Sequence, residues 1–450
     1  MTGENHSNIR RFTGGDDGVM DWLRSNGVEK VRVEWMDMHG IPRGKRVAVQ
    51  TFDDLRHKGV PFAALLFAID LQARWLRDTR FGEEIGFGDF YAVPDLSSMR
   101  LLRHEPNTAQ CLTNLHWADG SPIAEDPRNL LKNGLDRLKE LGFTAYAAPE
   151  FEFYYLTSDF QLSDTGENAY AMLKRWGFRE EEQALIDAAS AHVDYEACNY
   201  EYGPGQFEIT VEYGEAKDIA DAGHLFRATL KEAALAMGRR VTFMAKPFTE
   251  VAGSSCHLHF SLANEDGSNA FADENDPLKI SQTCRHFIGG VLAHFEELAT
   301  VFLPYPNSCK RIAPESFAPI SIAWGMDNRV AAVRVINVTP KGTRIELRVP
   351  GGDICLHLAL AALVAAGLDG IKSEIDPGPP AEGFLDLDAS VPKITTDWSK
   401  LLDHFDESAW IPKAMGADFF ELFGRLKRME HQRIISTVVQ EERDELIEMI

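Results

Sequence analysis

Hydrophobic positions recur with helical spacing in some parts of the chain and alternate with polar positions in others, which predicts a mixed α+β protein. Residues 18–28 have the spacing of a short helix, and residues 28–49 alternate as two strands around a turn at His39–Gly40. These elements predict a small α/β module near the N-terminus.

A polar stretch at residues 104–107 interrupts the pattern before an apolar strand begins at Ala109. We place a domain boundary at this stretch. The expected organisation is a flexible N-terminus over residues 1–14, a small N-terminal domain over residues 15–106 and a large second domain over residues 107–450.

The second domain contains the best-marked helix of the sequence. Asp126 is the expected N-cap, Pro127 occupies the first helical position and Gly142 follows the last turn. The segment between Thr157 and Asp194 is rich in loop signals. Further helices are expected at residues 218–238, 357–371 and 419–435, and strands at 144–156, 241–248, 254–262, 330–337 and 343–350.

Charge excludes several classes of partner. The chain has 46 Lys and Arg residues against 69 Asp and Glu, so its net charge is -23. This excess repels phosphate backbones and anionic lipids, so we expect no nucleic acid and no membrane as partner. No stretch approaches the roughly 18 apolar residues that span a bilayer, and the cysteines are scattered. We expect a cytoplasmic protein.

Glu150 and Glu152 lie two residues apart on the strand predicted at residues 144–156, so both carboxylates project from the same face. Alternating acids are common on solvated strands. The neighbours Phe151 and Phe153 are apolar, however, and indicate a buried strand, where unpaired carboxylates would be costly. A bound cation would remove that cost.

Two further segments supply similar groups. Glu201 and Glu208 lie on either side of a Gly-Pro-Gly turn, and His257 and His259 project from one face of a predicted strand. Taken alone, a His-x-His pair is more often a core or surface feature than a metal site. The combination with acids favours a metal site.

Arg344, Glu346 and Arg348 alternate along the last predicted strand, a pattern that by itself also fits a salt-bridge ladder. With Glu346, the set comprises five carboxylates and a neutral imidazole, which suits Mg²⁺ or Mn²⁺ better than structural zinc. Two hard cations fit this number of ligands.

Arginines supply the other half of a site for phosphoryl transfer. Arg311, Arg329 and Arg334 join Arg344 and Arg348. Cations and guanidinium groups stabilise the charge on a transferring phosphoryl group. The sequence has no GxxxxGK[ST] loop and no kinase signature set, so a different ATP-binding architecture is expected.

The motifs PEFEF, GPGQFE, GSSCHLHFS, NSCKR, DNR and RIELR occur in the order and approximate spacing of glutamine synthetase. The chain therefore resembles the glutamine synthetase superfamily, and within it the γ-glutamyl-amine ligases. The resemblance implies a β-grasp N-terminal domain packed on a catalytic domain with an antiparallel β-sheet funnel. It also implies a homo-oligomeric double ring, a dodecamer, with active sites between neighbouring subunits.

The resemblance implies site residues position by position. One metal ion would be bound by Glu152, Glu201 and Glu208, and a second by Glu150, His257 and Glu346. Glutamate would bind Gly253, Arg311 and Arg348. ATP would contact Glu196, His259, Ser261, Arg329, Arg334, Lys341 and Arg344, and Arg329 and Arg348 would also act in catalysis. The expected cofactors are ATP, as a co-substrate, and two or three Mg²⁺ or Mn²⁺ ions.

The sequence differs from the family where the family binds ammonium. The Asp of that pocket is replaced by Ala63, with Leu66 nearby, and the Glu of the flap by Phe317. An ammonium ion buried against these side chains would lose its hydration without a counter-charge. An apolar amine would instead gain about 0.8 kcal/mol for each buried methylene. We therefore expect an alkyl- or arylamine substrate, with Glu315 as a candidate acid or base.

Two other departures concern the acid substrate and regulation. Ala252 stands where the family has an Asn before the glutamate-binding Gly253, which leaves a different acid substrate open. The last tyrosine of the chain is Tyr305, so the C-terminal tyrosine that bacterial relatives adenylylate is excluded.

The predicted function is the ATP-dependent ligation of the glutamate γ-carboxylate to an amine through γ-glutamyl phosphate. The alternatives are a glutamine synthetase that uses ammonia, a γ-glutamyl-polyamine or γ-glutamyl-ethanolamine ligase, and a non-catalytic structural or nucleotide-sensing relative. The intact metal-ligand positions argue against the last of these. The identity of the amine and the choice between Mg²⁺ and Mn²⁺ stay open.

Overall fold

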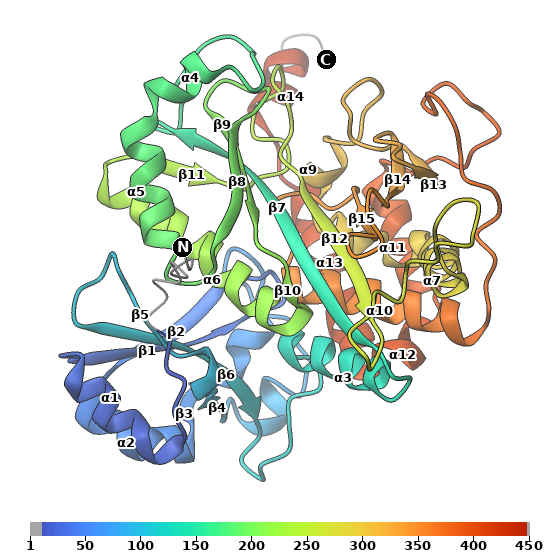
Figure 1. The fold of residues 1–450 in the computed structure, drawn as a ribbon. Coiled ribbons are helices and arrows are strands. Elements are labelled where there is room, and N and C mark those ends of the chain that lie inside the picture. The colour runs from blue at the N-terminus through green and yellow to red at the C-terminus, as the bar shows by residue number, and fades with distance from the viewer. Residues whose placement is uncertain (1–10, 448–450) are drawn as a thin grey trace, which may run out of the picture.

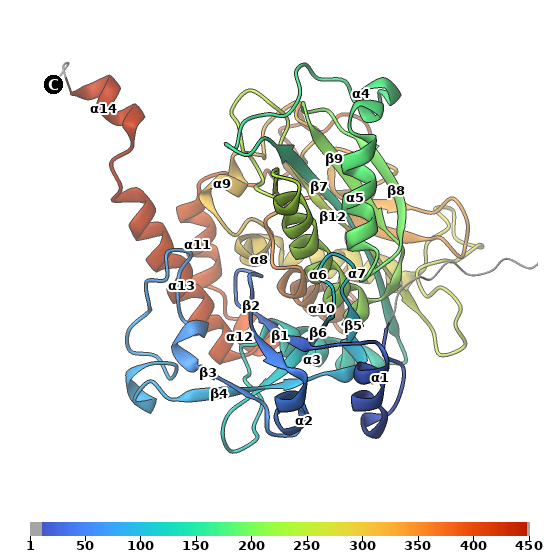
Figure 2. The same cartoon turned by 90° about the vertical axis from the view of Figure 1, so that its left-hand side faces the viewer.

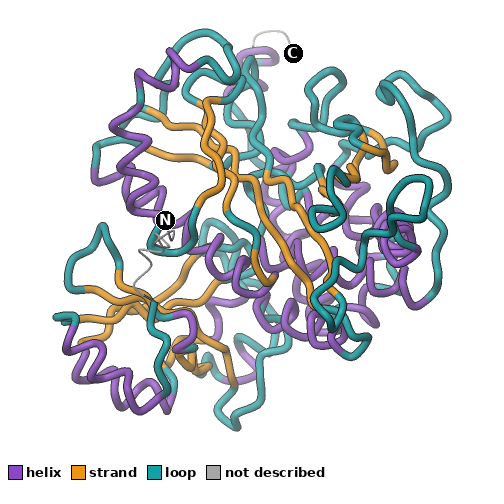
Figure 3. The backbone as a smooth tube through the Cα atoms, in the orientation of Figure 1, coloured by secondary structure: helices purple, strands orange, loops and turns teal. Residues whose placement is uncertain are grey.

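The computed structural model describes residues 11–447 and contains two β-sheets with helices packed around them (Figure 1, Figure 3). Most of the segment that we expect to be flexible, residues 1–14, lies outside the described residues. The smaller sheet is built near the N-terminus, and the strands of the larger sheet cross the molecule diagonally in Figure 1. The expected α+β fold is confirmed.

The six-stranded N-terminal sheet has the order β2-β1-β6-β4-β3, with β5 paired to β6. Strands β1 and β6 are parallel, whereas the other pairs are antiparallel. The turn predicted at His39–Gly40 connects β1 to β2. Its elements are α1 (Val19–Ser25), β1 (Lys30–Met36), β2 (Pro42–Ala48), α2 (Val49–Lys58), β3 (Val60–Ala63), β4 (Asp89–Pro94), β5 (Arg100–Leu101) and β6 (Thr108–His116).

Strand β6 bears on the domain boundary. We expected the boundary at 106/107, which would assign β6 to the second domain. In the structure β6 hydrogen-bonds with β1 and β4 in the N-terminal sheet, because its apolar residues pack into the core of that sheet. We propose that the boundary between the N-terminal domain and the second domain lies after His116.

The nine-stranded sheet has the order β13-β14-β15-β12-β7-β9-β8, with β10 and β11 paired to β7. All its pairs are antiparallel except β13 with β14. Its strands are β7 (Thr144–Leu156), β8 (Tyr195–Tyr200), β9 (Gln206–Val211), β10 (Gly214–Glu215), β11 (Arg240–Thr242), β12 (Cys256–Ala263), β13 (Ser321–Met326), β14 (Ala331–Ile336) and β15 (Arg344–Leu347).

Helices cover the large sheet and extend beyond it. The sequence predicted α3 correctly: the Asp126 side chain accepts a hydrogen bond from the Arg128 N–H, and Gly142 has a positive φ. The helices are α3 (Pro127–Lys139), α4 (Met172–Gly177), α5 (Arg179–Ala189), α6 (Ala216–Ala236), α7 (Gln282–Ala293), α8 (Phe295–Phe302), α9 (Pro306–Cys309), α10 (Leu356–Lys372), α11 (Trp398–Asp406), α12 (Ile411–Ala414), α13 (Ala417–Ile435) and α14 (Gln440–Leu446). Figure 2 shows α14 extending away from the body beyond the C-terminal end of α13.

Two segments differ from the pattern-based expectation. The loop-rich segment between Thr157 and Asp194 contains α4 and α5, and the acidic first turn of α5 favours the positive end of its helix dipole. The strand expected at residues 241–248 ends at Thr242, before the turn that leads to Lys246.

Ion pairs join α6 to β1 of the N-terminal sheet and to α3. The guanidinium of Arg32 on β1 bonds to the carboxylate of Glu232 on α6, with an Nη2–Oε1 distance of 2.7 Å. Arg128 on α3 bonds to Asp221 on α6 at 2.7 Å. Removing one partner of such a pair would leave a buried charge uncompensated.

Among residues 11–447, none of the helices combines the length and the apolar character needed to cross a bilayer.

Candidate active site

Strand register gathers the predicted acids on one face of the large sheet. Glu152 on β7 lies directly opposite Glu208 on β9, and Glu150 on β7 lies opposite His257 on β12. Like charges directly opposite each other destabilise an antiparallel pair. The sheet therefore positions a concentration of negative charge that needs a compensating cation.

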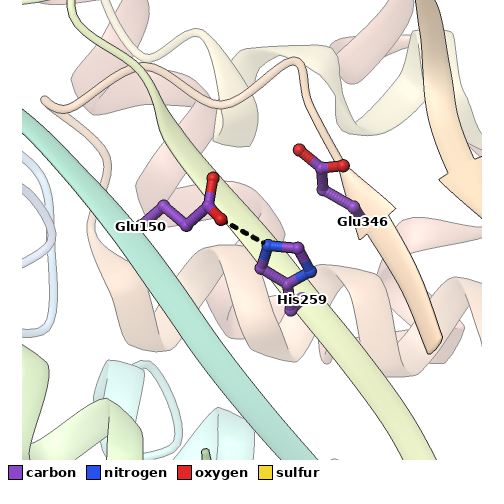
Figure 4. A group of neighbouring side chains, drawn as sticks. All are labelled: Glu150, His259 and Glu346. Carbon is purple, nitrogen blue, oxygen red and sulfur yellow. Dashed lines mark hydrogen bonds and ion pairs between the residues drawn. The ribbon is translucent and has the colours of Figure 1, made fainter. Parts of the chain in front are cut away.

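The next strand adds Glu346 to these acids. We call Glu150, Glu152, Glu201, Glu208 and Glu346 the row of acids. Glu346 on β15 lies opposite His259 on β12, and its side chain is 1% exposed. Nδ1 of His257 lies 3.1 Å from Oε2 of Glu150 and 3.5 Å from Oε1 of Glu346. Figure 4 shows Glu150, His259 and Glu346 projecting from three adjacent strands toward one point. These side chains are close enough to share an ion.

Two combinations of these ligand atoms lie within 4.8 Å of one another. One is Glu150 with Glu208 and His257, and the other is Glu150 with His259 and Glu346. Glu152 and Glu201, which we expected beside Glu208, belong to neither group. Glu152 instead accepts a hydrogen bond of 2.7 Å from the Ser255 N–H. The division of ligands between two ions thus stays a prediction.

Glu201 follows β8, in the turn that connects β8 to β9. The side-chain amide of Asn199 donates hydrogen bonds to Glu201 at 2.8 Å and to Glu208 at 3.1 Å. One amide therefore holds two carboxylates that come from opposite sides of the Gly-Pro-Gly turn.

Burial and the repulsion between neighbouring carboxylates raise the pKa values of Glu201 and Glu208. Burial, reinforced by the charge of Glu152, raises the pKa of Glu201 to about 7. Burial, together with the charges of Glu150, Glu152 and Glu201, raises the pKa of Glu208 to about 8. Both shifts indicate negative charge without sufficient compensation.

The acids next to the histidines behave in the opposite way. Burial opposes ionisation of Glu150, but hydrogen bonds with His257 and His259 outweigh burial and lower its pKa. Burial also opposes ionisation of Glu346, whose pKa is lowered by the charges of His257 and Arg348. These two carboxylates are therefore ionised and ready to bind a cation at neutral pH.

His259 is held in one tautomer. Nε of Arg344 lies 3.0 Å from Nδ1 of His259, and Nε2 of His259 lies 2.8 Å from Oε1 of Glu150. Because an arginine N–H can only donate, Nδ1 must accept, and Nε2 carries the proton that it donates to Glu150. His259 therefore orients the carboxylate of Glu150 within the row of acids.

The other arginines lie around Glu346. Nη1 of Arg334 lies 2.9 Å from Oε2 of Glu346, and Nη1 of Arg348 donates to Oε1 of the same carboxylate. Nε of Arg348 donates to the carbonyl of Arg329 at 2.9 Å. The side chains of Arg334 and Arg348 thus reach Glu346, where they can also meet phosphate oxygens.

Gly253 and Arg311 are in close contact. A Cβ at position 253 would lie 2.5 Å from Cγ of Arg311 and 2.7 Å from the carbonyl of Ala245, so only glycine fits. Arg311 is 5% exposed, and its Nε has no hydrogen-bond partner among the described residues. A buried guanidinium with a free donor is suited to bind an anion.

Two cavities meet at the row of acids. The larger, of about 750 Å³, is lined by the predicted residues Glu150, Glu152, Glu201, Glu208, Gly253, His257, Arg311, Glu315, Phe317, Arg329, Arg334 and Arg348. The second, of about 480 Å³, is lined by Glu150, Glu196, His259, Ser261, Lys341 and Arg344. Glu150 lines both cavities, so ligands in the two cavities would lie on either side of this carboxylate.

Two predicted residues are not part of this site within one chain. Ala63 ends β3 in the N-terminal sheet, and Leu66 lies in the turn that follows. Neither lines the two cavities. Their expected contribution to the site of a neighbouring subunit stays a prediction.

The larger cavity also contains residues that the sequence analysis missed. They include the aromatic residues Tyr170 and Tyr202, the acid Glu167 and the base Lys246. For Tyr202 a signal existed, because it follows Glu201 directly. The other three lie in segments without a recognisable motif.

Comparison with known proteins agrees with this geometry. The family model for the glutamine synthetase catalytic domain matches residues 124–446. The chain belongs to the glutamine synthetase family. This membership confirms the expected carboxylate–amine ligase class and the glutamine synthetase-like fold.

Relatives within the family include ligases for amines other than ammonia. A glutamate–isopropylamine ligase from a Pseudomonas species is 32% identical over 382 residues, which cover 81% of this chain and 83% of the relative. A gamma-glutamylethanolamide synthetase from Streptomyces coelicolor is 32% identical over 429 residues, which cover 91% and 90%. Other relatives are named glutamine synthetase. The ADP complex of GmaS has a TM-score of 0.85 at 27% identity and covers 95% of this chain and 99% of that chain.

Proposed function

We propose that the protein ligates the γ-carboxylate of glutamate to a substituted amine at the expense of ATP. One observation supports this most directly: Glu150 belongs to both cavities, at the centre of the row of acids. A nucleotide in the second cavity and glutamate in the larger one would therefore meet across the same carboxylates.

The row of acids fits divalent cations. Its donors are carboxylate oxygens and an imidazole, which suit Mg²⁺ or Mn²⁺, and the raised pKa of Glu208 indicates uncompensated charge. We propose two or three ions, held by Glu152, Glu201 and Glu208 and by Glu150, His257 and Glu346. Bound there, they would stabilise the charge of the transferring phosphoryl group.

The two organic substrates have separate subsites. The carboxylate of glutamate would bind the guanidinium of Arg311, which lines the larger cavity with Gly253 and Arg348. ATP would occupy the cavity that contains Glu196, Ser261 and Lys341, with Arg344 at its inner end. GmaS, which has the same fold, forms a complex with ADP, which supports a nucleotide as a ligand of this chain.

The reaction would proceed in two transfers. An oxygen of the γ-carboxylate forms a bond to the terminal phosphorus of ATP while the bond to the ADP oxygen breaks, which gives γ-glutamyl phosphate and ADP. The amine first gives the extra proton of its ammonium form to a cavity carboxylate such as Glu315. Its nitrogen then forms the C–N bond while the C–O bond to phosphate breaks, and the second proton lost from nitrogen passes to the departing phosphate. Arg329, Arg334 and Arg348 stabilise charge in both steps.

The amine is expected to be apolar rather than ammonia. Phe317 lines the larger cavity at the position where the family has an acid. A second candidate substrate class is amino alcohols or polyamines, favoured by Glu167 and Glu315, which line the same cavity. The gamma-glutamylethanolamide synthetase is a relative with such a substrate in its name.

We also propose a dodecamer of two stacked rings in the cytoplasm, where ATP and glutamate are available. In such a ring the segment that contains Ala63 and Leu66 would complete the site of a neighbour. The C-terminal segment supports assembly, because Val438, Val439 and Ile447 are exposed apolar residues on a projecting part of the chain (Figure 2). Native mass spectrometry would measure the number of subunits.

A phosphate-release assay tests the function. Purified protein with ATP, Mg²⁺ and glutamate is supplied in turn with ammonia, alkylamines, anilines, ethanolamine and polyamines. We expect release with alkyl- or arylamines, accompanied by the γ-glutamylamide in the mass spectrum, and loss of both with Glu346→Gln. If turnover were highest with ammonia, the prediction of an apolar amine pocket would be contradicted. If no amine caused phosphate release, a non-catalytic relative would be favoured.

A further inference from the structure

Three exposed aromatic side chains lie along the larger cavity. Tyr170 is 64% exposed, Tyr202 is 47% exposed and Phe317 is 57% exposed. The rings of Tyr202 and Phe317 stack with their centroids 6.0 Å apart and an interplanar angle of 26°. Exposing aromatic rings to water costs free energy unless another group covers them. The aromatic wall formed by Tyr170, Tyr202 and Phe317 is therefore suited to bind an organic group.

The backbone is strained at the points that hold these rings. Phe317 has φ +56°, Glu315 has φ +62° and Tyr170 has φ +58°. This left-handed conformation costs free energy for residues other than glycine, and for a bulky side chain it often marks a functional position. The strain therefore needs a structural cause.

Hydrogen bonds provide that cause. The Glu315 N–H donates to the carboxylate of Asp386 at 3.0 Å. The Ser316 hydroxyl donates to the carbonyl of Ala313 at 2.5 Å and lies 3.3 Å from the carbonyl of Arg311. The Tyr170 N–H donates to the carbonyl of Tyr200 at 2.9 Å. The contacts of Glu315 and Ser316 fix the neighbouring Phe317 relative to Arg311, the expected ligand of the acid substrate.

The chemistry of the wall matches an alkylammonium ion. Ring faces attract cations, and Tyr202 follows Glu201 directly, so the rings adjoin a carboxylate of the acidic row. An alkylammonium ion can place its charged nitrogen between the acids and the ring faces and lay its alkyl group along the rings. An arylamine is uncharged near neutral pH and would gain nothing from the acids or from a cation–π contact.

We propose that the stacked pair Tyr202 and Phe317 is the surface that selects the amine, and that it selects primary alkylammonium ions with an apolar substituent. This inference rests on the proposed function, since it names the substrate class of that site. Tyr202 and Phe317 act here as specificity-determining residues.

The test compares leucine and aromatic substitutions. Phe317→Leu and Tyr202→Leu keep an apolar side chain but remove the ring face, whereas Tyr202→Phe keeps the ring. Phe160→Leu is the matched control, because Phe160 is 61% exposed at φ +63° but lies outside both cavities. For each variant, kcat/KM is measured with isopropylamine, ethanolamine and ammonia, and the Kd of isopropylammonium is measured by calorimetry with ADP, Mg²⁺ and glutamate present.

We expect each leucine variant to lower kcat/KM for isopropylamine relative to ammonia by about tenfold and to weaken its Kd similarly, as expected for the loss of a cation–π contact. Tyr202→Phe and Phe160→Leu should retain the wild-type preference. The inference is overturned if the leucine variants keep that preference, if Phe160→Leu loses it, or if wild type does not bind isopropylammonium. Binding by the rings without turnover would contradict the proposed function alone.

Discussion

Arg344 donates a hydrogen bond from Nε to Nδ1 of His259, over 3.0 Å. This contact fixes Nε2 of His259 as the donor to Glu150, so a guanidinium on β15 determines the orientation of a carboxylate on β7. Partners that orient metal ligands in this way affect metal affinity although they do not bind the ion.

Substitution of His259 should therefore weaken metal binding. We expect His259→Phe to raise the Kd of Mn²⁺ by about 10- to 100-fold, because Glu150 loses the donor that orients it. Titration followed by electron paramagnetic resonance measures free Mn²⁺ directly. His286→Phe is a control, since His286 lies on α7 and outside both cavities. An unchanged Kd for His259→Phe would show that Glu150 is oriented without it.

Glu152 is expected to be essential for turnover. Glu152→Ala removes a predicted metal ligand and should abolish phosphate release, while the exposed residue Glu84 can be replaced by alanine without loss. Assays at saturating Mg²⁺ separate weak binding from lost chemistry. Substantial activity of Glu152→Ala under those conditions would reject Glu152 as a ligand.

The metal-free protein should lose stability as pH rises. Because the pKa of Glu208 is raised from 4.5 to about 8, the folded state binds more protons than the unfolded state between these values, and its free energy of unfolding falls across that range. Glu208→Gln should stabilise the metal-free protein at pH 8 on the order of 1–2 kcal/mol. Denaturant titrations at pH 5 and pH 8 measure the difference, with the exposed substitution Glu212→Gln as control. Equal effects of both substitutions would contradict the repulsion within the row of acids.

The contact between Gly253 and Arg311 predicts that a larger side chain at position 253 impairs the binding of glutamate but not that of ATP. Gly253→Ala would push Arg311 out of position and should raise the KM for glutamate by about tenfold or more, in line with the sensitivity of positioned groups to small shifts. The KM for ATP should stay unchanged, because ATP is assigned to the other cavity. Gly18→Ala, where a Cβ meets nothing within 4 Å, is the control. A parallel rise in both KM values would indicate a general distortion.

Phe317 should govern the use of ammonia. Phe317→Glu restores an acid where the family has one and should increase kcat/KM for ammonia relative to isopropylamine, since a buried ammonium ion needs a counter-charge. Competition between the two amines, followed by mass spectrometry of the products, measures the ratio. No change in the ratio would place this side chain outside the amine subsite.

Much of this site could be predicted from the sequence, for a physical reason. The period of two residues in a strand places Glu150 with Glu152 and His257 with His259 on common faces, whatever the rest of the fold. The register that sets Glu152 opposite Glu208 depends on how distant strands pair, so local pattern could not supply it. The contact of Tyr202 with Phe317 likewise joins two loops that no periodicity relates. The pairing of β6 with β1 and β4 could not be predicted from local pattern either, because it depends on how distant strands meet.

The central claim is that the row of acids on β7, β9, β12 and β15 binds a pair of divalent cations between the two cavities. Crystals grown with Mn²⁺ and ADP, with diffraction data collected at the manganese absorption edge, test it directly. We expect two anomalous peaks, one beside Glu152, Glu201 and Glu208 and one beside Glu150, His257 and Glu346. Anomalous peaks elsewhere, or no peak among these side chains at saturating Mn²⁺, would contradict it.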